Sequence, residues 1–121
     1  MIQLKRVYEA PSPQDGARFL VERLWPRGIR KENLPVDSWQ KEAGPSDKLR
    51  KWFSHDPAKW EQFKKKYFQE LDDKPETWEP IRKAARRGPV TLLYSSRDTE
   101  HNNAVALKQY LDAKGKRSKA P

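Results

Sequence analysis

The feature of this sequence that most restricts its fold is a short apolar segment, Val90 to Tyr94, which lies between Gly88-Pro89 and Ser95-Ser96. Its nearly continuous apolar character predicts a β-strand that is buried on both faces, as in the centre of a parallel sheet. The chain then passes through a polar turn into a segment with helical spacing. A buried strand that leads directly into a helix favours an α/β fold.

Three further segments have the pattern of strands. Residues 2–8 alternate apolar and polar side chains, and residues 17–24 form a second expected strand after a loop rich in turn-forming residues. Trp25-Pro26-Arg27-Gly28 ends this second strand, because proline removes a backbone donor and glycine permits a left-handed backbone. Residues 36–41 have the composition of a short third strand.

Four segments have helical patterns, and their starts coincide with residues that cap helices. Ser46 and Asp56 are suited to N-cap positions. Two more helices are expected, one from Thr77 to Gly88 and one from Asp98 or Thr99 to near Gly115. The segment after Asp56-Pro57 carries an amphipathic stripe at steps of three and four, made of Trp60, Phe63, Tyr67 and Leu71.

These elements predict a single α/β domain over residues 1–113, with a small, mostly parallel sheet of three to four strands packed by about four helices. Only 35% of the residues are hydrophobic and 36% are charged. The five Trp, four Tyr and four Phe residues compensate for the small number of aliphatic side chains, because aromatic side chains bury the most area per residue. The chain can therefore form a compact core.

The sequence contains no cysteine, which excludes disulfide bonds, thiolate nucleophiles and zinc–thiolate sites. No apolar run approaches the roughly 20 residues of a membrane-spanning helix. The first six residues also lack the apolar segment of a secretory signal. These features predict a cytoplasmic protein that does not interact with membranes.

The formal net charge is +9, and four of these positive charges lie in residues 114–121, which carry no acidic side chain. This segment is expected to be a basic, flexible tail. Basic charge attracts polyanions without specifying which one is bound. Two interpretations stay open: a tail that only increases solubility, and a tail that binds nucleic acid nonspecifically.

Two stretches, residues 21–28 and 92–104, contain the ends of predicted strands and the polar turns that follow them. The carboxyl ends of parallel strands meet at one edge of a sheet, where ligands bind in α/β proteins. If the two strands are neighbours, Arg23, Arg27 and Arg97 converge at this edge beside the N-terminus of the last helix. Guanidinium groups and free helix N–H groups together suit a phosphate or a carboxylate.

Catalytic chemistry has less support. His101 and Asp98 are the candidate acid–base residues, since the pKa of histidine lies near neutrality. Glycine-rich phosphate loops and the nucleophile-elbow motif are absent. The two histidines, His55 and His101, lack the spacing of a metal site. We expect no metal and no cofactor, and the sequence leaves open whether the chain is an enzyme.

Three separated stretches have unusual sequences: V-E-R-L-W-P-R-G at 21–28, L-R-K-W-F-S-H-D-P at 49–57, and L-L-Y-S-S-R-D-T-E-H-N-N-A at 92–104. Together they resemble the YeaO-like family of bacterial domains of unknown function, over about residues 2 to 112. The resemblance implies an α/β domain in a cytosolic setting, without a settled activity. The polar residues that match these motifs are Arg23, Arg27, His55, Arg97, Asp98, His101, Asn102 and Asn103.

The favoured hypothesis is a pocket that binds a phosphate-bearing small molecule or a nucleotide. Its ligand contacts would come from Arg23, Arg27, Arg97, Asn102, Asn103 and His55, with His101 and Asp98 available for hydrolytic or transfer chemistry. A nonenzymatic, nucleic-acid-associated basic protein is the first alternative, and it would use the helical lysines and the tail. A protein-interaction module with an exposed apolar patch at Trp25 or Trp39 is the second. The sequence does not determine the oligomeric state.

Overall fold

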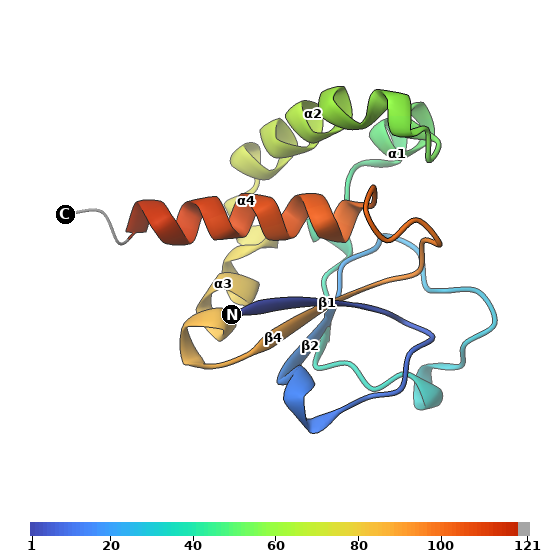
Figure 1. Cartoon of the computed structure of the whole chain (residues 1–121), viewed down its shortest axis with the longest axis vertical. Helices are drawn as coiled ribbons and strands as arrows, with labels where there is room; N and C mark the ends of the chain where they lie inside the picture. Colours follow the sequence, from blue (N-terminus) through green and yellow to red (C-terminus); the bar gives the residue numbers. More distant parts are fainter. Residues whose placement is uncertain (119–121) are drawn as a thin grey trace.

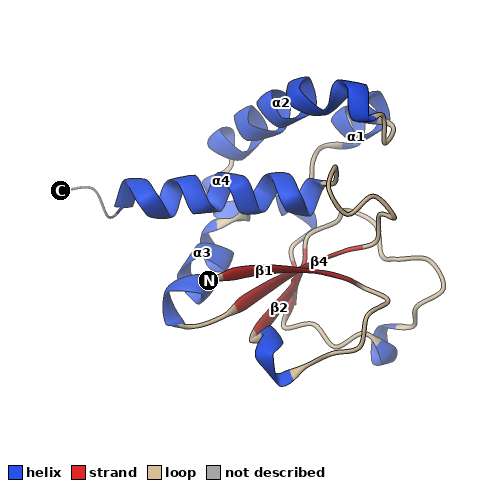
Figure 2. Cartoon of the chain, viewed as in Figure 1, coloured by secondary structure: helices blue, strands red, loops and turns tan. Residues whose placement is uncertain are grey.

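The computed structural model describes residues 1–118, and its centre is a sheet of four parallel strands (Figures 1 and 2). The strands are β1 (Ile2–Arg6), β2 (Ala17–Leu20), β3 (Ser38–Trp39) and β4 (Val90–Tyr94), in the spatial order β1-β4-β2-β3. Leu92 of β4 lies between Leu4 of β1 and Phe19 of β2. All five residues of β4 are buried, which confirms the predicted central strand.

The four helices are α1 (Asp47–Phe53), α2 (Trp60–Asp73), α3 (Glu79–Arg87) and α4 (Asn103–Ser118). The Ser46 side chain caps α1 by accepting a hydrogen bond from the Leu49 N–H. The Asp56 carboxylate caps a short 3-10 turn, Pro57–Lys59, that leads into α2. Both predicted N-caps are therefore confirmed, as is the α/β class with four strands and four helices.

The larger core lies between the sheet and the helices. Figure 1 shows α4 between the sheet and α2. The α2 stripe at positions 60, 63, 67 and 71 is buried here as predicted, together with Leu92 of β4 and Leu107 of α4. On the other face of the sheet, the chain between β2 and β3 takes the place of a helix layer. A smaller cluster lies there and contains Val7, Leu20, Leu34 and Leu93, with the half-buried Trp25 and Trp39 packed against it.

The end of β2 differs from the prediction, because the strand ends at Leu20 instead of residue 24. The Val21 N–H still donates to the Leu93 carbonyl, but the next carbonyl, that of Glu22, accepts from the Trp39 indole instead of a strand neighbour. Residues 22–27 thus leave the sheet as a loop. The third strand is also shorter than the predicted residues 36–41 and consists of Ser38 and Trp39 alone.

Two helix starts also differ from the prediction. Thr77 lies in a 3-10 turn, where its hydroxyl donates to the Lys74 carbonyl, and α3 begins at Glu79. The last helix begins at Asn103 instead of residue 98 or 99, because the Asp98 carboxylate accepts from two backbone N–H groups and holds residues 98–101 in a separate turn.

At its other end α4 continues to Ser118, past the predicted end near Gly115. The predicted tail at 114–121 therefore begins inside α4, and its last three residues lie outside the described ones. Within the part of the chain that the structure describes, no helix combines the length and apolar character that a membrane crossing requires.

Candidate functional site

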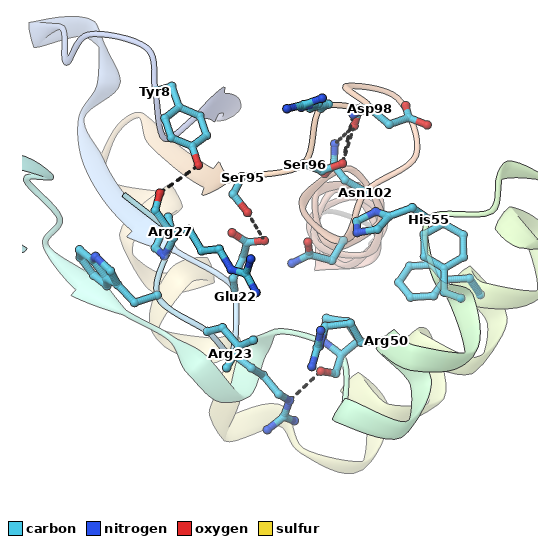
Figure 3. A pocket seen from close by; sticks show the side chains of 18 residues that line it. Tyr8, Glu22, Arg23, Arg27, Arg50, His55, Ser95, Ser96, Asp98 and Asn102 are labelled. Carbon is cyan, nitrogen blue, oxygen red and sulfur yellow. Dashed lines mark hydrogen bonds between the residues drawn. The ribbon is translucent and has the colours of Figure 1, made fainter. Parts of the chain in front are cut away.

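A pocket of about 670 Å³ opens at the edge of the sheet where β2 and β4 end (Figure 3). Its walls come from residues 22–27, from residues 95–98, from the start of α4 and from the C-terminal end of α1. The volume lies within the range of about 300–1,000 Å³ that is typical of small-molecule sites. Seven of the eight predicted site residues line it, namely Arg23, Arg27, His55, Arg97, Asp98, Asn102 and Asn103.

The three predicted arginines share this pocket but differ in their partners. The Arg23 guanidinium donates to the Pro45 carbonyl at 2.6 Å and to the Glu42 carboxylate at 3.1 Å, so much of its bonding capacity holds two loops together. Arg27 and Arg97 are exposed at the pocket rim. Within the described residues, their guanidinium groups make no hydrogen bond and no ion pair, so both cations are available to an anion.

The start of α4 forms one wall of the pocket. Asn102 is buried and caps the helix, since its side-chain oxygen accepts from the Val105 N–H and its amide donates to the Asp98 carbonyl. The Asn103 amide donates to the Val21 carbonyl at 2.6 Å, which ties the helix start to the end of β2. The two asparagines therefore fix the helix N-terminus against the sheet, with its partial positive charge beside the pocket.

His101 does not line the pocket. Its Nδ1 lies 3.0 Å from an Asp98 carboxylate oxygen, and its ring packs edge-on against Trp60 with the ring centroids 5.3 Å apart. Hydrogen bonds from the Glu100 and His101 N–H groups and from the His101 ring lower the pKa of Asp98 below its ordinary value. The Asp98–His101 pair thus orders the β4–α4 turn, and its histidine faces Trp60 instead of the cavity.

His55 reaches the pocket from the opposite wall, immediately after α1. It follows Ser54, and both residues have left-handed backbones, with φ values of 57° and 47°. Residues other than glycine adopt this conformation uncommonly, with Asn, Asp and His the most frequent among them, and it costs about 1 kcal/mol or more per residue. The double turn brings the chain from α1 to the cap of α2 and places His55 at the pocket mouth.

Glu22 is the pocket residue that the sequence interpretation missed. One of its carboxylate oxygens accepts from the Ser95 hydroxyl at 3.1 Å (Figure 3). The other oxygen, Oε1, is buried and has no hydrogen-bond partner in the described structure. Burial raises the pKa of Glu22 above its ordinary value, although the Ser95 hydrogen bonds and the attraction of Arg50 oppose this effect. The pocket is therefore lined by a carboxyl group that has one oxygen without a hydrogen-bond donor.

Arg50 was also missed, since it lies on a helix where its charge resembles that of any exposed basic residue. Its guanidinium makes only a long contact, 3.4 Å, with Asp47, and the residue lines the pocket. Trp25, Phe53 and Phe63 also line the pocket, but only Trp25 is partly exposed, since the two phenylalanines are buried in the larger core. The available signal for Glu22 and Arg50 was their position inside the motifs at 21–28 and 49–57.

A metal site has no geometric support in the described part of the chain, where no group of three or more His, Cys, Asp or Glu side chains is close enough to hold an ion. The acidic groups near the pocket are engaged in other ways. Asp98 binds backbone N–H groups, and Glu22 binds Ser95. The pocket thus combines cationic groups at its rim with the carboxyl groups of Glu22 and Asp98.

Comparison with known proteins gives consistent matches along the whole chain. Residues 1–121 match the family described as the inactive DUF488-N3 subclade. The chain is 42% identical over 110 residues to YeaO from Escherichia coli (strain K12), a match that covers 91% of this chain and 96% of YeaO. It is 38% identical over 113 residues both to Rv3073c from Mycobacterium tuberculosis (strain H37Rv) and to Mb3100c from Mycobacterium bovis, and each match covers 93% of this chain and 95% of the relative.

All three relatives carry the name of an uncharacterized protein. No solved structure matches this chain. The family match spans every residue, and the three motifs that resemble YeaO-like sequences lie within it. The chain therefore belongs to the inactive DUF488-N3 subclade and is a YeaO-like α/β domain.

Proposed function

We propose that this protein binds a phosphate-bearing small molecule, such as a nucleotide, in the pocket at the carboxyl ends of β2 and β4. The observation that carries the proposal is the pair of unpartnered arginines, Arg27 and Arg97, on the rim of one concave cavity. Arginine presents a planar fork of donors that matches phosphate oxygens. Arg50 adds a third cation from α1, and Arg23 contributes mainly by positioning the loops that carry the pocket.

The concave shape favours a small ligand over a long polyanion. A cavity of this volume encloses a nucleotide-sized molecule, whereas nonspecific nucleic-acid binding requires an extended cationic surface. The α4 N-terminus supplies a favourable electrostatic potential for an anion at the same place. The half-buried Trp25 on the wall offers aromatic surface for a flat ring system.

Binding without catalysis is the form of the function that the site supports best. The predicted acid–base pair, His101 and Asp98, is engaged internally, and the histidine packs against Trp60 instead of lining the cavity. The matched family is itself described as inactive. A catalytic histidine must reach the proton that it transfers, directly or through one water molecule. The protein would therefore act as a ligand-binding domain.

The test is a titration of a fluorescent mononucleotide at low and at physiological salt with the wild type, Arg97→Ala and Arg87→Ala. Arg87 is a matched control, because it is exposed at the end of α3, near the opposite edge of the sheet. Loss of one charged hydrogen bond costs about 1.5–3 kcal/mol, which corresponds to a tenfold or greater loss of affinity. We expect this loss in Arg97→Ala and no change in Arg87→Ala. Equal affinities of the three proteins, or no binding at all, would contradict the proposal.

A further inference from the structure

Two buried side-chain polar atoms have no hydrogen-bond partner among the described residues, Oε1 of Glu22 and Nη2 of Arg18. Arg18 lies in a buried ion cluster with Asp15 and Lys5, away from the pocket. Glu22 Oε1 belongs to a residue that lines the pocket. A buried carboxylate oxygen without a donor is costly, and native proteins rarely retain one without a reason. The missing partner of Glu22 Oε1 therefore suggests that a group outside the chain, such as a ligand, donates to this atom.

The neighbours of Glu22 fix its orientation but do not complete its bonding. The Ser95 hydroxyl donates to Oε2 and leaves Oε1 without a donor (Figure 3). Arg50 attracts the carboxylate electrostatically, but among the described residues its guanidinium donates its hydrogen bond to Asp47 and not to Glu22. Since Ser95 anchors the carboxyl group, Glu22 is held beside the pocket, and a small movement of its side chain would uncover Oε1 for a ligand donor.

The cationic side chains and the Glu22 carboxyl group of this pocket have opposite preferences for a ligand. A phosphate beside Glu22 would suffer like-charge repulsion, whereas a phosphate at Arg27 and Arg97 would be attracted. A hydrogen-bond donor has the reverse preference, because carboxylates accept from amino groups such as the exocyclic amines of nucleobases. Trp25, which is half-buried, lines the same cavity and offers aromatic surface to a planar ring.

We propose that the ligand of this pocket is a nucleotide whose base carries an exocyclic amine, with its phosphate at Arg27 and Arg97 and its amine donating to Glu22 Oε1. This inference rests on the proposed function and specifies the ligand class of the same site. Glu22 is a specificity residue in this arrangement, and the arginines supply affinity for any phosphate. A ligand without the amine would lose this hydrogen bond and would offer Glu22 at most a ring N–H donor.

The experiment compares two pairs of ligands. Guanosine and inosine 5′-monophosphate differ only by the 2-amine, whereas uridine 5′-monophosphate has a carbonyl oxygen and an N3–H group where cytidine 5′-monophosphate has the 4-amine and an unprotonated N3. Ribose 5-phosphate serves as a probe without a base. Affinities are measured by calorimetry for the wild type, Glu22→Leu, Glu22→Gln and Arg97→Ala, each checked for folding by circular dichroism. In at least one pair, we expect the wild type to bind the amine-bearing member about tenfold or more tightly, as loss of a hydrogen bond to a buried charge predicts.

Glu22→Leu should abolish this preference without weakening ribose 5-phosphate, because a neutral, similarly sized side chain removes the acceptor and the repulsion together. Glu22→Gln retains one acceptor oxygen and should reduce the preference only in part. If Glu22→Leu ranks the nucleotides as the wild type does, or if the wild type shows no amine preference, this inference is wrong while Arg97-dependent phosphate binding still stands. If neither the nucleotides nor ribose 5-phosphate bind, the proposed function fails as well.

Discussion

Glu22 and Asp98 lie beside the same pocket, yet their environments shift their pKa values in opposite directions. Backbone N–H groups and His101 stabilise the charged form of Asp98, which lowers its pKa. Burial destabilises the charged form of Glu22 and raises its pKa, since one oxygen has no donor. Asp98 is thus satisfied within the fold, whereas Glu22 keeps an unmet bonding requirement at the site where a ligand would enter.

The raised pKa of Glu22 makes a prediction about stability. A carboxyl group whose pKa rises on folding favours the folded state while it is protonated, and this contribution is lost as pH increases from its ordinary value of 4.5 through the raised value. Glu22→Gln stays neutral at every pH. At neutral pH the free energy of unfolding of Glu22→Gln should therefore be about 1 kcal/mol higher than that of the wild type, because the variant has no unpaired buried charge at this position.

Urea denaturation at several pH values measures this difference. The gain from Glu22→Gln should shrink as pH falls and vanish below about 4.5, where the wild-type carboxyl group is also protonated in both states. Glu76→Gln removes a charge from an exposed position and is the matched control. A stability gain that does not depend on pH would show that the charge of Glu22 is not its cause.

At the residue scale, the sequence predicted most of the polar side chains that gather at the pocket, but not Glu22 and Arg50, and not how each one is used. Arg23, Arg27 and Arg97 line one pocket because parallel strands β2 and β4 end at the same edge, and this could be inferred from strand order and motif position. The hydrogen bonds of Arg23 to Pro45 and Glu42 could not be inferred, because they depend on loops folded back from later in the chain.

At the scale of elements, two glycines with positive φ values serve different purposes. Gly16 precedes β2, and a Cβ atom there would collide with the carbonyl group of Pro89, which accepts a hydrogen bond from the Ala17 N–H. Gly28 also has a positive φ value, 78°, but no atom lies within 4 Å of the position of its Cβ. The first glycine permits β2 to approach β4, and the second only allows a loop to turn.

This difference predicts unequal effects of the same substitution. Gly28→Ala should cost about 1 kcal/mol of stability, which is the strain of a left-handed alanine. Gly16→Ala adds a backbone collision to that strain and should cost about 3 kcal/mol or more. Thermal or urea unfolding of the two variants measures both values, and each protein controls for the other. Equal losses would mean that the contact between residue 16 and Pro89 is not restrictive.

Element boundaries were predicted less well than element types, for an identifiable reason. Hydrophobic spacing located the stripe of α2 and the central strand β4, since both are deeply buried. Long-range partners set the ends: the Trp39 indole takes the Glu22 carbonyl at the end of β2, and the Asp98 turn delays the start of α4 to Asn103. Such contacts join residues that a local pattern does not connect.

At the scale of the whole molecule, the net charge of +9 predicts a second type of binding that is independent of the pocket. Several basic side chains already interact within the protein. Lys59 and Lys66 make cation–π contacts with the Trp52 ring, and Lys64 forms an ion pair with Glu61. The remaining positive field should still attract DNA without reading its sequence. This association is expected to depend on salt, because DNA binding releases several counterions. When a mononucleotide binds in the concave site, the protein neutralises only one phosphate group.

A labelled DNA duplex should therefore lose affinity steeply as salt increases from 50 to 200 mM, by roughly a hundredfold if about four phosphates are contacted. Arg97→Ala should change DNA affinity no more than Arg87→Ala does, because each removes one charge from a diffuse field. Mononucleotide binding should show the reverse behaviour, with weak salt dependence and strong dependence on Arg97. DNA binding that persists at physiological salt and disappears in Arg97→Ala would instead assign the pocket to nucleic acid, and the ligand would then enter as part of a strand.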